Sequence, residues 1–353
     1  MAKTKYPHLR NPSASPILSR WTSHRSRVES DQPPGNPFRK TRIFPFSGHS
    51  GGFTTELYRV LDLPLMRTTH RWRNPLGISE AMHIASKGNI MSRIAKLFED
   101  RSRKRFIAYI CGMDPDLPTS IDICRALVEA GTDLIEIGVP FSDPLADGKT
   151  NQLAAERALA NGAKVDQVFE MARALRVESQ VPLVLYTYYN LVMSQGVETY
   201  VRKAAEAGID GILTLDLPPE EAADMVQACK SHHIDNIFIV APTTPEDRIP
   251  IITRDAGGFI YYVSREGVTG ERNDMVSDLA ERVALIKAHT NLPVGVGFGI
   301  SSPEQVKAVV QHADAAIVGS ALVRLVADKG PDRQAIVTAV RDKALHLISG
   351  LNA

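Results

Sequence analysis

The sequence predicts an α/β fold, a (β/α)8 TIM barrel preceded by a disordered N-terminal extension. From about Met91 to the C-terminus, eight short apolar runs alternate with segments of helical periodicity. The runs are continuously apolar, as expected for parallel strands that are buried on both faces. Eight such units in about 230 residues match the usual barrel size of about 250 residues. A doubly wound open sheet is the alternative, but no GxGxxG follows the first run.

The composition limits the class of protein. The chain has 353 residues, of which 44% are hydrophobic and 23% are charged. These values exclude a collagen-like, disulfide-dense or wholly disordered protein, and the lack of a run of about 18 apolar residues excludes a membrane span. Three widely separated cysteines argue against a zinc site and a disulfide framework, and they favour a reducing compartment. They are Cys111, Cys124 and Cys229.

The net charge of +1 combines two different segments. Residues 1–81 hold 13 basic and 5 acidic residues, and they contain 9 of the 22 prolines. Their net charge is therefore +8, against −7 for the rest. A segment this rich in Arg, Ser and Pro cannot bury enough apolar surface to offset chain entropy. We expect residues 1–81 to be a disordered extension and residues 82–353 to be the catalytic barrel.

Three interpretations of the extension are open. Its Arg-rich, Ser-rich and acid-poor composition is that of a transit peptide, which would place the protein in a plastid. Its charge would suit a nucleic-acid-binding arm, but no interleaved aromatic residues support one. The third is extra sequence before a true start at Met82 or Met91, and with it we expect a cytoplasmic protein that binds neither nucleic acid nor membrane.

The barrel elements follow one another in order from Met91. The first is a short helix, with apolar spacing at Ile94, Leu97 and Phe98. The strands are expected at Phe106–Cys111, Leu134–Gly138, Leu183–Tyr188, Gly211–Asp216, Asn236–Ala241, Phe259–Val263, Val294–Phe298 and Ala315–Gly319. Gly131 ends one intervening helix, and Ser302-Pro303 begins another.

Two carboxylates lie where a TIM barrel places its chemistry, at the carboxyl ends of strands and in the following loops. Glu136 interrupts the apolar run LIEIG, and Asp147 belongs to the next loop. A carboxylate in a buried strand is costly unless it is paired or functional, and burial raises its pKa towards values suited to proton transfer. A structural ion pair is the alternative for Glu136, and an Asp-Gly turn is the alternative for Asp147.

The last three loops predict a phosphate site. SREGVTGERND contains Gly267 and Gly270, which let backbone amides approach an anion and give a lid its hinges. The seventh strand ends in GFGISSPEQ, and Gly319-Ser320 opens a helix after the eighth. Backbone N–H groups after these two strands are where this fold usually holds phosphate. Each glycine taken singly could be a simple tight turn.

Aromatic residues at the strand ends predict an apolar pocket for a flat ring. They are Tyr109, Tyr186, Tyr188, Tyr189, Tyr261, Tyr262 and Phe298. Because most such residues fill a barrel core, we expect two or three of the seven to contact a ligand.

The stretch LIEIGVPFSDPLADG, followed in order by SREGVTG, GFGISSPEQV and VGSALV, resembles the α subunit of tryptophan synthase. The resemblance runs from about Met91 to the C-terminus. It implies a lyase that splits indole-3-glycerol phosphate into indole and glyceraldehyde 3-phosphate by a retro-aldol reaction, with no metal or organic cofactor. It also implies an α2β2 tetramer, in which a β subunit containing pyridoxal phosphate receives the indole.

The resemblance assigns roles to single residues. Glu136 matches the general acid/base, and Asp147 matches the carboxylate that stabilises positive charge on the indole nitrogen. The matches to the substrate and phosphate pocket are Tyr109, Tyr186, Tyr261, Gly267, Thr269, Phe298, Gly299, Gly319 and Ser320. The matches to the partner-contact surface are Asp143, Pro144 and Met193.

Two segments depart from the family pattern. Residues 149–152 read Lys-Thr-Asn-Gln where Pro-Thr-Ile-Gln is usual, and residues 111–114 read Cys-Gly-Met-Asp where Thr or Ala-Gly-Asp is usual. Lys149 adds a charge beside Asp147, and Asn151 replaces an apolar contact. Two alternative functions stay open: a free-standing lyase that releases indole, and a weakly active subunit that activates a β subunit.

Overall fold

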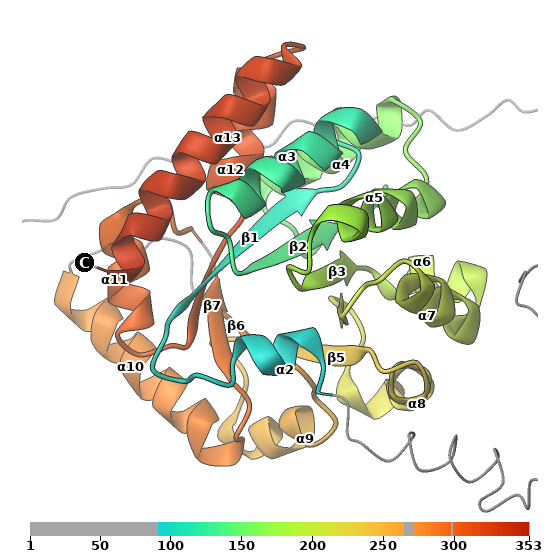
Figure 1. The fold of residues 1–353 in the computed structure, drawn as a ribbon. Helices are drawn as coiled ribbons and strands as arrows, with labels where there is room; N and C mark the ends of the chain where they lie inside the picture. The colour runs from blue at the N-terminus through green and yellow to red at the C-terminus, as the bar shows by residue number, and fades with distance from the viewer. Residues whose placement is uncertain (1–90, 265–271, 298, 353) are drawn as a thin grey trace, which may run out of the picture. The chain divides into compact units, whose positions relative to one another are not determined.

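The computed structural model describes residues 91–264, 272–297 and 299–352, which contain a closed barrel of eight parallel strands (Figure 1). The strands pair in chain order, and β8 closes onto β1. They are β1 Arg105–Cys111, β2 Leu134–Gly138, β3 Leu183–Thr187, β4 Gly211–Thr214, β5 Asp235–Val240, β6 Ile260–Val263, β7 Val294–Gly297 and β8 Ala315–Val318. The predicted TIM barrel is therefore confirmed, with strand ends that shift by at most two residues. The extension, residues 1–81, lies outside the described residues.

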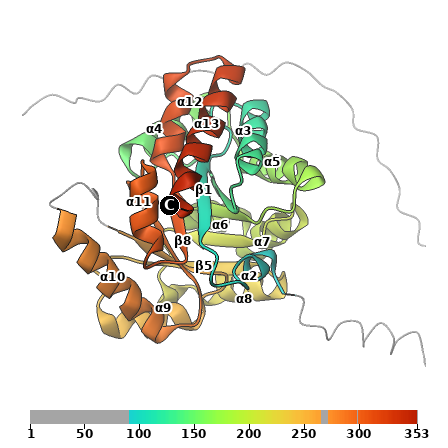
Figure 2. The same cartoon turned by 60° about the vertical axis from the view of Figure 1, so that its left-hand side comes forward.

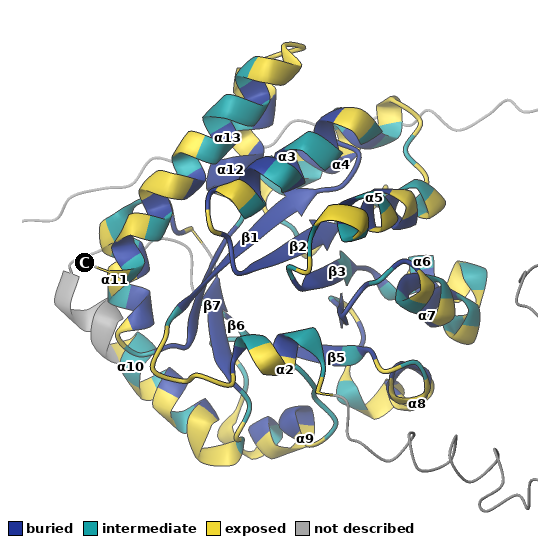
Figure 3. Ribbon diagram, viewed as in Figure 1, coloured by how far each residue is buried: buried dark blue, intermediate teal, exposed yellow. Residues whose placement is uncertain are grey.

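Helices surround the barrel, and their outward faces are exposed while the strands are buried (Figure 3). They are α2 Arg93–Leu97, α3 Leu117–Glu129, α4 Lys149–Ala160, α5 Val165–Glu178, α6 Tyr189–Gln195, α7 Val197–Glu206, α8 Ala223–Ser231, α9 Ile249–Arg254, α10 Arg272–His289, α11 Pro303–Val310, α12 Ser320–Asp328 and α13 Arg333–Ile348. Short 3-10 turns lie at Pro219–Glu221, Glu246–Arg248 and Ser349–Leu351. Figure 2 shows α12 and α13 beside α3 and α4. In the part of the chain that the structure describes, no helix is long and apolar enough to cross a bilayer.

The predicted helix ends have the expected local structure. Gly131, just after α3, has φ +90°, which a glycine adopts without steric cost. Ser302 caps α11, and its side chain accepts from the N–H of Gln305 while the Gln305 side chain accepts from the Ser302 N–H at 3.1 Å. Pro303 occupies the first turn, where its missing N–H would have had no helical partner.

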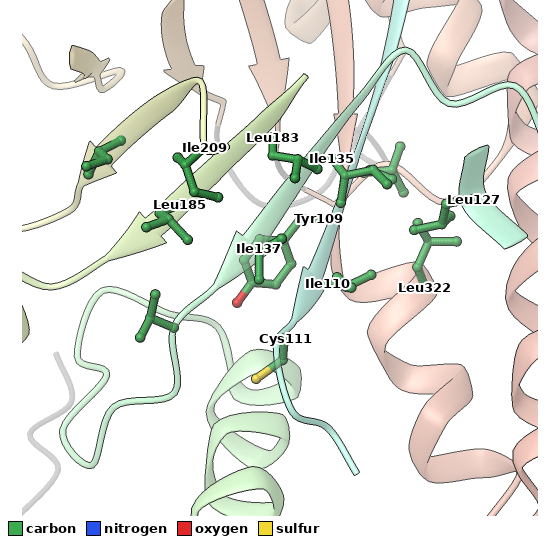
Figure 4. Packing of buried hydrophobic residues seen from close by; sticks show 14 of the residues in the cluster. Tyr109, Ile110, Cys111, Leu127, Ile135, Ile137, Leu183, Leu185, Ile209 and Leu322 are labelled. Atoms are coloured by element: carbon green, nitrogen blue, oxygen red, sulfur yellow. The ribbon is translucent and has the colours of Figure 1, made fainter. Parts of the chain in front are cut away.

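Two apolar layers hold the barrel together. The larger lies between strands and helices and includes Leu127, Ile135 and Ile137 (Figure 4). The smaller fills the barrel interior, and α2 closes its amino end. Ile94 of α2 is fully buried, and the ring of Phe98 lies 6.2 Å from that of Phe259. The short helix predicted near Met91 is therefore part of the core.

Buried aspartates connect neighbouring strands at the amino end of the barrel. Asp133, Asp210 and Asp314 stand directly before β2, β4 and β8. Each carboxylate accepts a hydrogen bond from a backbone N–H of the strand before it, at 2.8 or 2.9 Å. Each also contacts a basic side chain within 3.1 Å; these are Arg103, Arg176 and Lys287. One carboxylate thus holds two strands in register and is neutralised where it is buried.

We predict that Asp210→Ala lowers the free energy of unfolding by about 3 kcal/mol, because breaking a buried pair leaves uncompensated charge. Asp210 contacts Arg93 at 2.8 Å and Arg176 at 2.9 Å, and it accepts from the N–H of Leu183. Urea unfolding of both proteins measures the difference. The matched control is Asp342→Ala, which removes an exposed pair with Arg341 and should cost less than about 1 kcal/mol. If both variants lose the same free energy of unfolding, Asp210 does not stabilise the barrel by bridging β3 and β4.

Candidate active site

Side-chain alternation decides which residues reach the upper interior of the barrel. Leu134, Val184 and Phe259 belong to the apolar interior cluster. Side chains two positions apart on a strand face the same way, so the next inward-facing residues lie one layer closer to the carboxyl end. They are Glu136, Tyr186 and Tyr261. Side chains with polar groups therefore follow directly on the apolar side chains of the barrel interior.

A cavity of about 270 Å³ lies at this end of the barrel. Its wall includes the rings of Tyr109, Tyr186 and Tyr261, residues 146–151, and Ile317. Gly299, Gly319 and Ser320 complete it. The cavity thus brings together three of the aromatic residues, Asp147 and the glycines after β7 and β8. Gly267, Thr269 and Phe298 lie outside the described residues.

Two glycines make room for the phenol groups of the wall. A Cβ on Gly138 would lie 2.3 Å from the hydroxyl of Tyr109, and a Cβ on Gly297 would lie 2.5 Å from that of Tyr261. Such distances are far below van der Waals contact, so only glycine fits beside these rings. The sequence shows both glycines at strand ends but gives no sign that a tyrosine on the neighbouring strand requires them.

Glu136 is buried without a compensating partner. Its exposed fraction is 0%, and within the described residues neither carboxyl oxygen has a hydrogen-bond partner. The structural ion pair considered as an alternative is therefore wrong for this part of the chain. Burial raises the pKa of Glu136 to about 8, so the group is mainly a neutral acid at pH 7. It does not line the cavity. Tyr186 and Tyr261 do, and their pKa values are raised mainly by burial and further by the nearby carboxyl groups of Asp147 and Glu136.

Asp147 has a more polar environment. It is half-buried, and its two oxygens accept hydrogen bonds from the hydroxyls of Tyr186 at 3.2 Å and Tyr188 at 2.7 Å. Burial raises the pKa of Asp147, whereas these hydroxyls and the Asn151 side chain lower it. Asp147 also belongs to a turn, in which its N–H donates to the Pro144 carbonyl at 3.1 Å. Asp147 is therefore a turn residue that also lines the cavity.

Helix N-termini supply the positive end of the cavity. α4 begins after Gly148 and α12 begins after Gly319, and no side chain caps either helix. The two helices pack against each other, and both open on the cavity. Unpaired N–H groups at a helix start attract anions. Lys149, the first residue of α4, lines the same cavity. Among the described residues, no cluster of His, Cys, Asp or Glu side chains could hold a metal ion.

Exposed side chains occur in the β2–α4 loop and on α6. Asp143 is exposed and Pro144 is half-buried. Leu145 is 90% exposed, and Met193 on α6 is 60% exposed. Sequence reasoning did not single out Leu145, because an isolated leucine in a loop carries no signal. It named Tyr188 only as one of seven aromatic candidates for the pocket wall, since the sequence gives no sign that its hydroxyl reaches Asp147 in the β2–α4 loop.

Comparison with known proteins identifies the family. A family model described as "Tryptophan synthase alpha chain" matches residues 95–348. The alpha chain of Opitutus terrae is 51% identical over 263 residues, which are 74% of this chain and 99% of the relative. That of Geobacter sulfurreducens is 44% identical over 260 residues, covering 71% of this chain and 98% of the relative.

Solved structures agree with the sequence comparisons. A chain of Mycobacterium tuberculosis tryptophan synthase superposes with a TM-score of 0.67 at 36% identity, covering 74% of this chain and 99% of that chain. A chain from the Pyrococcus furiosus tryptophan synthase α2β2 complex gives 0.65 at 36% identity, covering 70% and 98%. The fold, the extent of the match and the level of identity together show that this chain belongs to the tryptophan synthase alpha chain family.

Proposed function

We propose that this chain cleaves indole-3-glycerol phosphate to indole and glyceraldehyde 3-phosphate, and that Glu136 and Asp147 carry out the reaction. As a tryptophan synthase alpha chain it is a lyase that needs no cofactor of its own. The observation that carries the residue assignment is the contrast between two carboxyl groups, of which Asp147 lines the cavity and Glu136 does not. Glu136 is fully buried and has no hydrogen-bond partner among the described residues, while Asp147 accepts hydrogen bonds from two phenol hydroxyls.

The contrast suits a retro-aldol reaction. Glu136, as a neutral acid, protonates the indole carbon that bears the glycerol phosphate chain, which places positive charge on the ring nitrogen. Asp147, as an anion, stabilises that charge. Glu136 then takes the proton of the neighbouring hydroxyl, the carbon–carbon bond breaks, and its electrons return to the ring as the aldehyde forms. Burial raises the pKa of Glu136 to about 8, whereas the phenol hydroxyls that donate to Asp147 oppose the effect of burial on its pKa. Different environments can thus give two carboxyls separate roles.

Glu136 must move for this chemistry. Because its side chain does not line the cavity, rotation about its side-chain bonds has to bring the carboxyl to the substrate. The absence of hydrogen bonds to either oxygen from the described residues means that the rotation breaks none. A substrate held at the α12 N-terminus by its phosphate would present its ring to the tyrosine wall.

The partner we propose is a tryptophan synthase β subunit, in an α2β2 assembly of the kind named for the Pyrococcus furiosus complex. The cofactor of that assembly, pyridoxal phosphate, belongs to the β subunit. The contact surface would include Asp143, Pro144 and Met193, as well as Leu145. Leu145 and Met193 would give this surface exposed apolar side chains. Three buried free cysteines support a reducing, cytoplasmic location.

Cleavage measured with and without a purified β subunit tests the function. We expect purified protein to cleave indole-3-glycerol phosphate slowly, and much faster when the β subunit is added. High turnover by the protein alone would instead favour the free-standing lyase. Stimulation of the β subunit without any cleavage would favour a regulatory subunit.

Glu136→Gln should abolish cleavage while binding of a phosphate-bearing substrate analogue persists, because the amide cannot donate and recover a proton. Steady-state kinetics and isothermal titration of the analogue measure the two properties. Turnover close to that of the wild-type protein would rule out the assigned role.

Stability against pH provides the folding control for this variant. The native state keeps the Glu136 proton up to about pH 8, whereas the unfolded chain releases it near pH 4.5. The free energy of unfolding of the wild type should therefore fall between these pH values, and that of Glu136→Gln should lack this fall. The variant should thus be relatively most stable near pH 8. Loss of both stability and activity at that pH would show that its inactivity reflects misfolding.

We also propose that residues 82–353 suffice for catalysis. The family match begins at residue 95, and the first helix of the core begins at Arg93. Deletion of residues 1–81 should leave the unfolding midpoint and the rate of cleavage unchanged, both alone and with a β subunit. Loss of solubility or of β-subunit stimulation in the shortened protein would assign the extension a role in the working enzyme.

A further inference from the structure

The carboxylate of Asp147 accepts hydrogen bonds from two tyrosines at the carboxyl end of β3. Tyr186 Oη donates to Oδ1 at 3.2 Å, and Tyr188 Oη donates to Oδ2 at 2.7 Å. The tyrosines are two residues apart at the end of β3, so their side chains leave the strand on the same side. Each oxygen of the carboxylate therefore has its own phenol donor, and the plane of the carboxylate is set by both.

Tyr188 is itself held in place. Its hydroxyl accepts from the N–H of Ala146 at 3.1 Å, and its ring centroid lies 4.9 Å from that of Phe141. The side chain is buried, at 5% exposure. Tyr188 thus joins the β2–α4 loop to β3 at two points besides Asp147. Tyr186 is fixed less tightly, by an edge-on contact with Tyr109 at 4.9 Å between centroids.

We propose that Tyr186 and Tyr188 are positioning residues that hold Asp147 ionised and aimed into the cavity, with Tyr188 the stronger of the two. The proposal rests on the function assigned above to Asp147. Hydrogen bonds from O–H to a carboxylate are stronger than neutral ones, and the shorter distance belongs to Tyr188. The tyrosine pair thereby opposes the cost of burying the charge.

Among the described residues, the other groups around Asp147 are neutral or form no ion pair with it. Tyr109 and Cys111 on β1 and Tyr261 on β6 face it from the barrel, and burial keeps these three groups neutral by raising their pKa values. Asn151 on α4 adds a neutral side chain that favours the anion. Lys149 lines the same cavity, and no ion pair joins its ammonium to Asp147 within the described residues. Removing a phenol hydroxyl should therefore raise the pKa of Asp147.

The test compares Tyr188→Phe, Tyr186→Phe and the double variant with the wild-type protein, all as full chains assembled with a β subunit. We expect Tyr188→Phe to lower kcat/KM at neutral pH by about tenfold, since a hydrogen bond to a charged group contributes that much or more. We also expect the acidic limb of its pH profile to move to higher pH. Tyr186→Phe should shift the limb less, and the double variant should approach the rate of Asp147→Asn.

Tyr200→Phe is the matched control. It removes a buried hydroxyl that contacts Thr187 at 3.4 Å, away from the cavity, and should leave the acidic limb in place. If Tyr188→Phe lowers the rate equally at every pH, as a purely structural defect would, the proposal is wrong. An unchanged rate and profile would be equally decisive against it.

A readout that does not need turnover separates this proposal from the proposed function. Carbon NMR of 13C-aspartate-labelled protein follows the titration of the Asp147 carboxyl, which Asp147→Asn identifies by its missing signal. The proposal expects the titration midpoint to rise in Tyr188→Phe and to stay in place in Tyr200→Phe; no rise in Tyr188→Phe overturns it. If the wild-type protein cleaves no substrate but the titration midpoint of Asp147 still rises in Tyr188→Phe, the proposed reaction is wrong and the positioning role of the tyrosines is retained.

Discussion

Closure of the parallel sheet, through pairing of β8 with β1, is the constraint on which the rest of the molecule depends. Once the sheet is closed, most strand residues are buried, and the carboxyl ends of all strands meet around one axis. Side chains from positions as far apart as Tyr109 and Ser320 then share one cavity. The amino end serves a different purpose: α2 fills the interior there, and aspartates tie neighbouring strands. Stability and chemistry are therefore concentrated at opposite ends.

Buried carboxyl groups are compensated differently at the two ends of the barrel. At the amino end, each buried aspartate accepts a backbone N–H and contacts a basic side chain, so its burial is compensated. At the carboxyl end, Glu136 has no such compensation from the described residues and takes up a proton instead. Asp147 lies between these cases, with neutral donors rather than a cation. Burial raises the pKa of both carboxyls, but only for Asp147 do hydrogen-bond donors oppose that rise.

Much of the fold follows from local sequence properties. Continuous apolar runs predicted all eight strands, and Ser302-Pro303 and Gly131 marked helix ends correctly, because these signals act over a few residues. The continuously apolar run LIEIG also predicted correctly that Glu136 is buried. The sequence did not predict the aspartates that bridge neighbouring strands, nor the need for glycine beside Tyr109 and Tyr261. Each of these features depends on a partner from a neighbouring strand.

The sequence by itself determined the fold class, the order of the elements, the family resemblance and the two candidate carboxylates. Only the tertiary structure decided how these carboxylates are held: that Glu136 has no partner among the described residues and lies behind the cavity wall, and that Tyr188 reaches back to Asp147. Patterns along a chain report the periodicity of one element at a time. Hydrogen-bond partners, dryness and the pKa of a side chain depend on groups that closure of the barrel brings together from distant parts of the chain.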